Sequence, residues 1–179
     1  MVALSPLLGA MALVLRAHLG APVVFRQVRP GLHGRPFTLL KFRTMEMGTV
    51  GDADAARLTG LGAWMRAYAI DELPSLWNVL RGDMSLVGPR PLLMAYLARY
   101  TPTQARRHDV RPGLTGLAQV HGRNAVGWDE RLAYDVWYVD HRSFRLDLNI
   151  LLRTVRLLAR REGVNAPGHA TMPEFQRAA

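Results

Sequence analysis

Residues 70–82, IDELPSLWNVLRG, decide how the central part of this chain folds. Their apolar residues recur at spacings of three and four, which places them on one face of a helix. These apolar residues are Leu73, Leu76, Trp77 and Leu80. Pro74 falls in the first turn, where a missing N–H costs nothing, and Gly82 follows the last apolar position, as a helix-ending residue does. The pattern therefore predicts a helix that begins at Asp71.

Two adjacent carboxylates, Asp71 and Glu72, stand at the start of this helix. A carboxylate at a helix start is most often an N-cap, which accepts a hydrogen bond from a backbone N–H. Two carboxylates at the positive end of a helix are also placed to hold a divalent cation and a phosphate. A carboxylate can further act as a nucleophile toward phosphorus and form an acyl phosphate. The residues alone leave both interpretations open.

The basic residues supply candidate ligands for phosphate. The chain carries 23 Lys and Arg against 14 Asp and Glu, a formal net charge of +9, which favours anionic partners. Lys41 is the only lysine, and a compact ammonium suits a phosphate site. Arg90 lies between two prolines that nearly fix its backbone, which favours a phosphate clamp. Arg123 follows the permissive Gly122, and each of these three cations could equally be an ordinary surface or loop residue.

Short apolar runs and turn residues predict the remaining body of the chain. Residues 23–25 and 37–40 flank a Pro30-Gly31 turn, which is typical of a β-hairpin. We further expect a loop over 46–54, helices over 61–68 and 92–100, an extended segment over 83–87 and a strand over 117–120. From Gly163 onward the chain has few apolar residues, which indicates a tail or lid.

Several other chemistries are excluded by what the sequence lacks. There is no cysteine, so disulfides and thiolate chemistry are ruled out. The six histidines have no metal-ligand spacing, and no Gly-rich phosphate loop or nucleophile-elbow serine is present. No helix-turn-helix or RNA-binding motif is found, so nucleic acid is not an expected partner.

Two segments raise the question of a membrane. Residues 1–15 are apolar except for Ser5, but a spanning helix needs about 20 apolar residues. They predict either a buried core helix or a segment that enters the membrane without crossing it. Residues 148–161 predict an amphipathic helix with arginines on one face, which either lies on an anionic membrane or covers a core with its charged face in solvent.

At this point the sequence resembles the bacterial sugar transferase family, the monotopic phosphoglycosyl transferases. The resemblance covers nearly the whole chain and is closest to the small members that transfer N,N′-diacetylbacillosamine 1-phosphate. The segments that carry it are Lys41-Phe42-Arg43-Thr44-Met45, Ile70-Asp71-Glu72-Leu73-Pro74, Trp77-Asn78-Val79-Leu80, Gly82-Asp83-Met84-Ser85, Val87-Gly88-Pro89-Arg90-Pro91 and Arg111-Pro112-Gly113-Leu114-Thr115-Gly116.

The resemblance implies a two-step, Mg²⁺-dependent reaction. Asp71 is expected to attack the sugar-bearing phosphorus of a UDP-sugar, expel UMP and then pass the phosphosugar to undecaprenyl phosphate. Glu72 is implied as the second catalytic carboxylate, with both carboxylates as metal ligands. The residues implied in substrate binding are Lys41, Arg90, Arg123 and Asp147.

The resemblance also implies an α/β fold, mostly helical with short β-hairpins, in a compact monotopic domain. Residues 1–20 are expected to form a re-entrant membrane helix that lacks its first limb, because only four residues precede Ser5. Residues 21–179 are expected to form the catalytic domain. The implied location is the cytoplasmic face of the bacterial inner membrane, with anionic membrane lipids as partners.

The sugar and the class of protein each have an alternative. The compact length and the C-terminal pattern favour an acetamido sugar, and a hexose-1-phosphate transferase using UDP-galactose or UDP-glucose is the alternative. A non-catalytic basic protein that binds membranes or nucleic acid is an alternative of a different class. Such a protein would have no use for the Asp71-Glu72 pair or for a proline-flanked Arg90.

Overall fold

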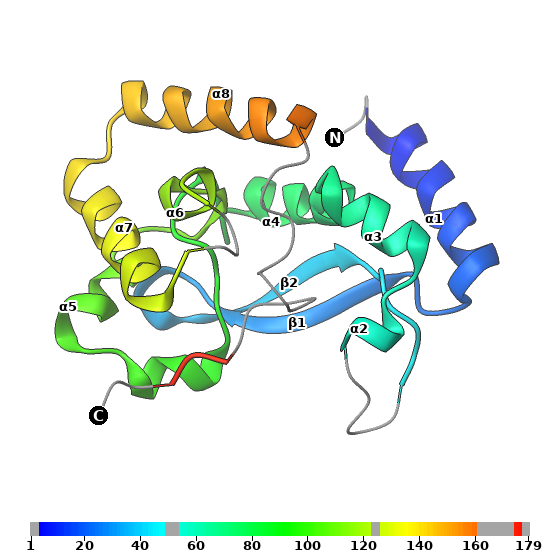
Figure 1. The fold of residues 1–179 in the computed structure, drawn as a ribbon, viewed down its shortest axis with the longest axis horizontal. Helices are drawn as coiled ribbons and strands as arrows, with labels where there is room; N and C mark the ends of the chain where they lie inside the picture. Colours follow the sequence, from blue (N-terminus) through cyan, green and yellow to red (C-terminus); the bar gives the residue numbers. More distant parts are fainter. Residues whose placement is uncertain (1–3, 49–53, 123–125, 161–173, 177–179) are drawn as a thin grey trace.

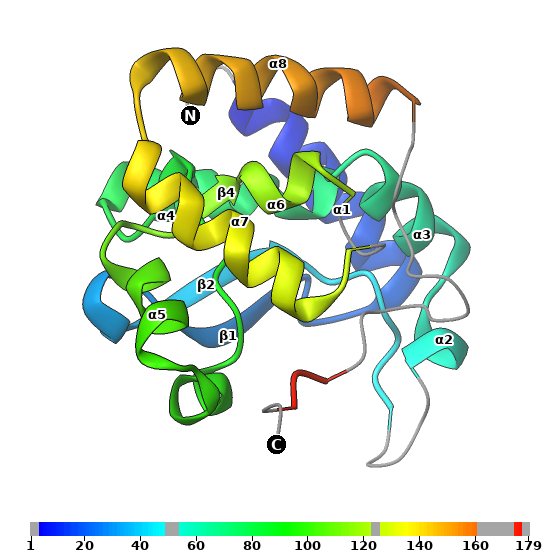
Figure 2. The same ribbon diagram turned by 60° about the vertical axis from the view of Figure 1, so that its left-hand side comes forward.

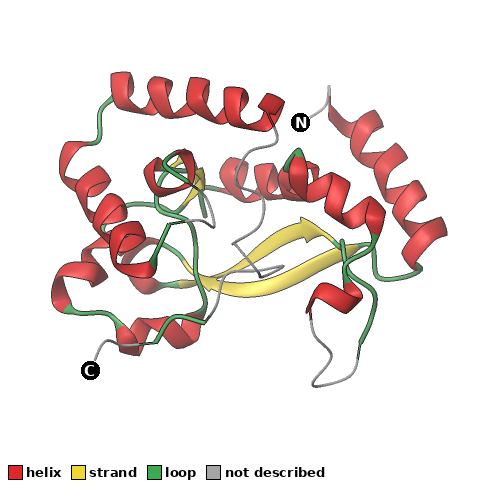
Figure 3. Ribbon diagram, in the orientation of Figure 1, coloured by secondary structure: helices red, strands yellow, loops and turns green. Residues whose placement is uncertain are grey.

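The computed structural model describes residues 4–48, 54–122, 126–160 and 174–176, and shows short strands surrounded by helices (Figures 1 and 3). The strands are β1 (Val24–Pro30), β2 (Pro36–Phe42), β3 (Ser85–Val87) and β4 (Gly113–Thr115). The α-helices are α1 (Ser5–Leu19), α2 (Asp54–Arg57), α3 (Gly60–Ala67), α4 (Leu76–Arg81), α5 (Pro102–Ala105), α6 (Leu117–Val120), α7 (Trp128–His141) and α8 (Phe144–Arg160). The 3₁₀ helices are η2 (Leu32–Gly34), η3 (Ile70–Ser75), η4 (Met94–Arg99) and η5 (Arg106–His108).

The predicted hairpin is confirmed and is longer than the two apolar runs that indicated it. Strands β1 and β2 pair antiparallel from Val24 opposite Phe42 to Pro30 opposite Pro36. Lys41 lies inside β2, opposite Phe25, so its backbone is held by the strand pairing. A two-stranded hairpin is only marginally stable by itself and needs a further layer to pack against.

The segment that begins at Ile70 supplies this layer, but not with the face that its apolar spacing indicates. Ser75 and Asn78 are its most deeply buried side chains, whereas Trp77 and Leu80 are about half exposed or more. The reason is that both polar side chains bond to β2. The Ser75 hydroxyl donates to the Leu40 carbonyl at 2.6 Å, and the Asn78 amide donates to the Thr38 carbonyl at 2.8 Å and accepts from the Leu40 N–H at 3.2 Å.

The start and end of this segment explain its geometry. Ala69 adopts a left-handed conformation with φ 54°, and the first turns, which contain Pro74, are 3₁₀ rather than α-helical. The helix therefore begins at Ile70, one residue before the expected start, and Asp71 is in its first turn. The predicted helix end is confirmed, since Gly82 has φ 83° and its N–H bonds back into the last turn.

The expected strand over residues 117–120 is wrong: these residues form α6. The strand lies just before them, as β4, and pairs parallel with β3 through Ser85–Gly113 and Val87–Thr115. Glycine makes this approach possible, because a Cβ on Gly113 would lie 2.1 Å from the backbone nitrogen of Gly88. Residues 117–120, three of them apolar, form a run too short for its periodicity to separate helix from strand.

Helix α8 packs against β3, β4 and α6, while α7 packs against α6, and α8 lies above α6 in both views (Figures 1 and 2). The sequence interpretation missed α7. The predicted amphipathic helix is confirmed but begins four residues earlier, at Phe144. Only Ile150 of α8 is fully buried, while Leu148, Leu152 and Val155 are exposed. Part of its apolar face therefore does not cover a core.

Helix α1 packs one side against the body and exposes the other. Leu15 is fully buried with Phe42 and Met65, whereas Leu13 and Val14 are exposed. Among the described residues, no helix combines the length and the apolar character that crossing a membrane requires. The re-entrant helix and the membrane-associated fold remain predictions.

The other expected segments are recovered in part. The helix over 61–68 is confirmed as α3, and the helix over 92–100 is the 3₁₀ helix η4. The expected loop over 46–54 and the tail from Gly163 fall largely outside the described residues. Within that tail, Phe175 is buried against Tyr96, Tyr100 and Trp128.

Candidate functional site

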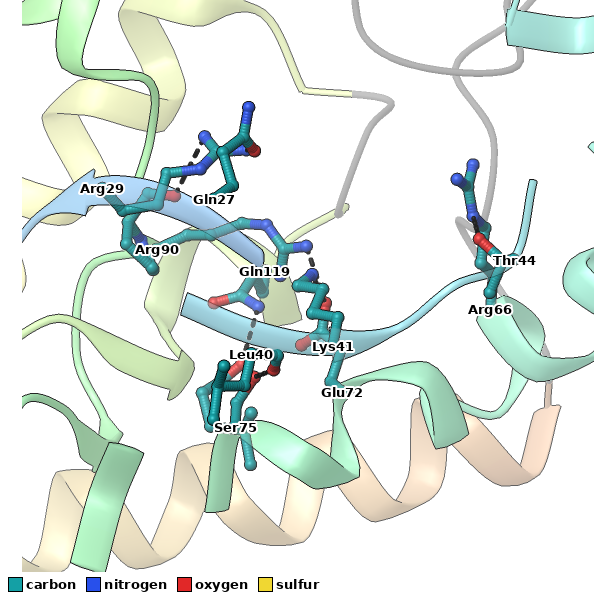
Figure 4. Close-up of polar contacts among 12 residues, drawn as sticks. Gln27, Arg29, Leu40, Lys41, Thr44, Arg66, Glu72, Ser75, Arg90 and Gln119 are labelled. Atoms are coloured by element: carbon teal, nitrogen blue, oxygen red, sulfur yellow. Dashed lines mark hydrogen bonds and ion pairs between the residues drawn. The ribbon is translucent and has the colours of Figure 1, made fainter. Parts of the chain in front are cut away.

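Three elements bring four of the six predicted site residues together, and Figure 4 labels three of these, Lys41, Glu72 and Arg90. Lys41 comes from β2, Asp71 and Glu72 from η3, and Arg90 from the loop after β3. Lys41 Nζ lies 2.6 Å from Glu72 Oε1, and Arg90 Nη2 lies 2.7 Å from the same oxygen. One carboxylate oxygen therefore joins two cations that are 49 residues apart in the chain.

Glu72 is held in its ionised form by these cations. Its side chain is 14% exposed, and burial alone would raise its pKa. The charges and hydrogen bonds of Arg90 and Lys41 outweigh burial and hold the pKa of Glu72 well below its usual range. Because its pKa is held so low, Glu72 stays ionised near neutral pH and is suited to orient Lys41 and Arg90 rather than to exchange a proton.

Asp71 has a different environment from its neighbour. It is 8% exposed, and within the described part of the chain its carboxylate forms no hydrogen bond or ion pair, so it is not an N-cap. Burial, followed by the charge of Glu72, raises the pKa of Asp71 from 3.8 to about 6. Two adjacent carboxylates thus have pKa values displaced in opposite directions, which is how two such groups acquire separate roles.

Lys41 and Arg90 keep donors for a ligand. Lys41 Nζ has three N–H donors and the Arg90 guanidinium has five. In the described part of the chain, the side-chain partner of each is Glu72. Burial lowers the pKa of Lys41, an effect that Glu72 opposes, and Glu72 raises the pKa of Arg90. The arrangement presents two oriented cations beside the Asp71 carboxylate, which suits a phosphate group.

Further arginines surround this site, and the sequence interpretation missed them. Arg29 of β1 donates to the Pro91 carbonyl at 3.5 Å and to Gln27. Burial, followed by the charge of Arg90, lowers the pKa of Arg29 to about 10. Arg107 is buried and donates to the Arg90 carbonyl at 2.7 Å. In a chain whose basic residues are nearly all arginine, nothing in the sequence distinguishes these two from the rest.

The other two predicted substrate-binding residues are not part of this arrangement. Arg123 lies outside the described residues. Asp147 of α8 accepts a hydrogen bond from the Tyr138 hydroxyl at 2.8 Å and lines a cavity of about 570 Å³. None of Lys41, Asp71, Glu72 and Arg90 lines that cavity. The substrate-binding role of Asp147 remains a prediction.

The chemistry of the two carboxylates is compatible with Mg²⁺. The described part of the chain has no group of three or more acidic or histidine side chains that could form a protein cage for a metal. Mg²⁺ commonly takes only one or two carboxylates and completes its shell with water and substrate phosphates. The free Asp71 carboxylate and the second oxygen of Glu72 fit an ion of this kind.

A buried carboxylate without a hydrogen-bond partner among the described residues, next to two oriented cations, is an arrangement that suits phosphoryl transfer. The family model for the bacterial sugar transferases matches residues 1–161. The chain therefore belongs to the bacterial sugar transferase family, which confirms the prediction from its motifs.

Curated relatives agree with this assignment. An uncharacterized sugar transferase of Bacillus subtilis, EpsL, is 57% identical over 166 residues, covering 90% of this chain and 82% of EpsL. A UDP-glucose:undecaprenyl-phosphate glucose-1-phosphate transferase of Caulobacter vibrioides is 46% identical, covering 84% of this chain and 62% of that protein. An undecaprenyl-phosphate galactose phosphotransferase of Salmonella typhimurium is 38% identical, covering 80% of this chain but only 35% of that protein.

Proposed function

We propose that this protein transfers a hexose 1-phosphate from a UDP-sugar to undecaprenyl phosphate through a covalent intermediate on Asp71. The observation that carries the proposal is the unbonded Asp71 carboxylate next to a Glu72 that holds Lys41 and Arg90. The Caulobacter and Salmonella relatives are named for glucose and galactose. These names favour the hexose alternative over the acetamido sugar.

The first step exchanges one phosphorus–oxygen bond for another. A carboxylate oxygen of Asp71 attacks the sugar-bearing phosphorus, and the bond from that phosphorus to the bridging oxygen breaks. UMP leaves with the bridging oxygen and its electron pair, and an acyl phosphate remains on Asp71. Lys41 and Arg90 stabilise the charge that builds up on the phosphate oxygens, while Glu72 holds both cations in place.

The second step returns Asp71 to its starting form. A phosphate oxygen of undecaprenyl phosphate attacks the same phosphorus, and the carboxylate of Asp71 leaves. The product is a sugar joined to the lipid through a diphosphate. Both reactants of this step are anionic, so the excess of basic residues around Arg90, including Arg29, favours their approach.

We further propose that Asp71 and Glu72 hold Mg²⁺ together with the substrate phosphates. The bound ion would neutralise phosphate charge and orient the diphosphate. Glu72 would bind the ion through Oε2, because its contacts with Lys41 and Arg90 use only Oε1.

The proposal is tested by UMP release from UDP-glucose, UDP-galactose and UDP-N-acetylglucosamine, each with and without undecaprenyl phosphate. A nucleophilic carboxylate predicts some UMP release without the lipid, up to one equivalent of enzyme, and turnover when the lipid is added. Preference for the N-acetylated sugar would restore the acetamido interpretation. No UMP release from any sugar would refute the proposed reaction.

The reaction should have an acid limb near pH 6. Asp71 attacks only when ionised, and its pKa is raised to about 6, so kcat/KM should fall about tenfold per pH unit below that value. Glu72 does not titrate in this range, because its pKa is held well below its usual value. The charge of Arg66 lowers the pKa of Asp71, so Arg66→Met should move the acid limb to higher pH. A rate that stays constant from about pH 7 to pH 5 would contradict this role of Asp71.

We also propose that α8 lies on an anionic membrane surface. Its exposed apolar side chains stand beside arginines, and surface attraction of this kind is screened by salt. The protein should co-sediment with anionic liposomes at low salt and partly dissociate at high salt. Leu152→Asp should weaken binding, whereas Met47→Asp, at a similarly exposed loop residue (64% and 73% exposed), should not. Equal binding by both variants, or no binding at low salt, would rule out this role of α8.

A further inference from the structure

The Pro89-Arg90-Pro91 loop is held by its carbonyl oxygens. Neither proline has an N–H, so this loop can be fixed through only a few backbone groups. The Pro89 carbonyl accepts from the Gly113 N–H at 3.0 Å. The Arg90 carbonyl accepts from Arg107 Nη2 at 2.7 Å, and the Pro91 carbonyl lies 3.5 Å from Arg29 Nη1. Among these donors, the Arg107 guanidinium gives the shortest contact, and it acts on Arg90 itself.

Arg107 is itself fixed by a buried carboxylate. Asp135 of α7 accepts from Arg107 Nε at 3.0 Å and from Nη2 at 2.6 Å, both on its Oδ2 oxygen. The two side chains are 1% and 3% exposed, and Arg107 Nη1 also lies 3.4 Å from the Tyr100 hydroxyl. Nη2 thus bridges the Asp135 carboxylate and the Arg90 carbonyl, which sets the position of the Arg90 backbone.

A buried ion pair needs a reason other than stability. Its desolvation offsets much of its attraction, so well-packed apolar residues of similar size often stabilise a protein as much or more. Apolar replacements could fill the same volume here, but they could not donate a hydrogen bond to the Arg90 carbonyl. Displacement of a charged group by about 1 Å can slow catalysis on the order of 100-fold.

We propose that Arg107 and Asp135 are positioning residues that set the Arg90 guanidinium for phosphate. This inference rests on the proposed function. Asp135 orients Arg107, Arg107 fixes the carbonyl of Arg90, and the Arg90 side chain then reaches Glu72 at 2.7 Å and the substrate beside it. The ion pair acts on the reaction only through Arg90.

A double-mutant cycle tests this coupling. It compares wild type, Arg90→Lys, the pair variant Arg107→Met with Asp135→Leu, and all three substitutions together. We expect the pair variant to remain folded and to lose roughly 10- to 100-fold in kcat, with a smaller change in KM for the UDP-sugar. If the pair acts through Arg90, then Arg90→Lys should cost much less in the pair variant than in wild type. If the fold losses in kcat of Arg90→Lys and of the pair variant simply multiply in the triple variant, the proposal is overturned.

The chain provides a matched control on the same two elements. Arg106 of η5 precedes Arg107 and forms an ion pair with Asp140 of α7, five residues after Asp135. Both side chains of this pair are exposed. Arg106→Gln with Asp140→Asn should leave kcat within about twofold of wild type, since this pair does not contact Arg90. A loss equal to that of the buried pair would indicate general damage to the packing of α7 and would count against positioning.

Two additions keep the test decisive. If the pair variant does not fold, Arg107→Lys replaces it, because a lysine still pairs with Asp135 but a single ammonium does not reproduce the bridging fork. UDP affinity is measured by calorimetry for every variant, so the coupling is read without turnover. If the wild type is inactive but the effects of the substitutions on UDP affinity are coupled, the proposed reaction is refuted and the positioning role is not. If the changes in UDP-binding free energy are additive, or if no substitution changes UDP affinity, the positioning role is refuted.

Discussion

Asp71→Asn is expected to abolish UMP release while the protein stays folded. The amide has nearly the shape of the carboxylate but cannot attack phosphorus, and no other described acidic side chain stands free beside Lys41 and Arg90. UMP release is measured with the sugar preferred by wild type, together with circular dichroism spectra of both proteins. A variant with activity near that of wild type would exclude Asp71 as the nucleophile.

The same substitution should stabilise the fold at neutral pH. The pKa of Asp71 is 3.8 when unperturbed and about 6 in the folded protein, so the folded state holds the proton more tightly. As pH rises from about 4 to above 6, ionised Asp71 therefore costs folding stability, on the order of 3 kcal/mol at pH 7. The neutral amide of the variant carries no such cost. Thermal unfolding should favour the variant at pH 7, and the difference should shrink toward pH 4.

An exposed carboxylate serves as the control for stability. Asp109 lies at the surface after η5, and Asp109→Asn should change the melting temperature little at either pH. If Asp71→Asn is no more stable than wild type at pH 7, burial of the charged Asp71 is not costly, and the raised pKa is contradicted.

Arg90→Lys is expected to lower kcat on the order of 100-fold, although it keeps the charge. The Arg90 guanidinium donates to Glu72 from one nitrogen and has further donors in a fixed plane for the phosphate. A lysine has one ammonium, which cannot hold Glu72 and two phosphate oxygens in the same geometry. Steady-state UMP release measures the loss, and it should fall mainly on kcat.

Arg26→Lys is the matched control for this change. Arg26 is exposed on β1 and neighbours Gln27, yet alternation along the strand directs its side chain to the face opposite that of Gln27 and Arg29. Its substitution should leave kcat within a few-fold of wild type. Should Arg90→Lys behave like Arg26→Lys, the Arg90 side chain would be structural rather than a phosphate ligand.

The sequence predicts those features that local residue patterns encode. The hairpin follows from two apolar runs around Pro30-Gly31, and the helix end follows from Gly82, which adopts φ 83°. Lys41 stood out as the only lysine and Arg90 by its two prolines, and both contact Glu72. The resemblance, rather than spacing, joined them to Asp71, because no local rule relates β2 to a loop 49 residues later.

Long-range contacts account for what the sequence did not predict. Ser75 and Asn78 are buried because β2 offers backbone groups to bond, and this partner is 35 to 40 residues away. The strand before residues 117–120 depends on the close contact of Gly88 with Gly113. The Arg107–Asp135 pair could not be predicted from the sequence either. What distinguishes Arg107 from the other arginines is its hydrogen bond to the Arg90 carbonyl, which only the fold creates.

The bonds from Asn78 and Ser75 also decide how the outer edge of the hairpin behaves toward other molecules. An unpaired strand edge is a template on which a second chain can add a strand, and this leads to aggregation. Along β2 the Thr38 carbonyl and both backbone groups of Leu40 are already bonded by side chains that are fully or almost fully buried. A foreign strand would have to displace these side chains before it could pair. The strand that carries Lys41 is thus protected from edge-to-edge association by two small polar side chains instead of a third strand.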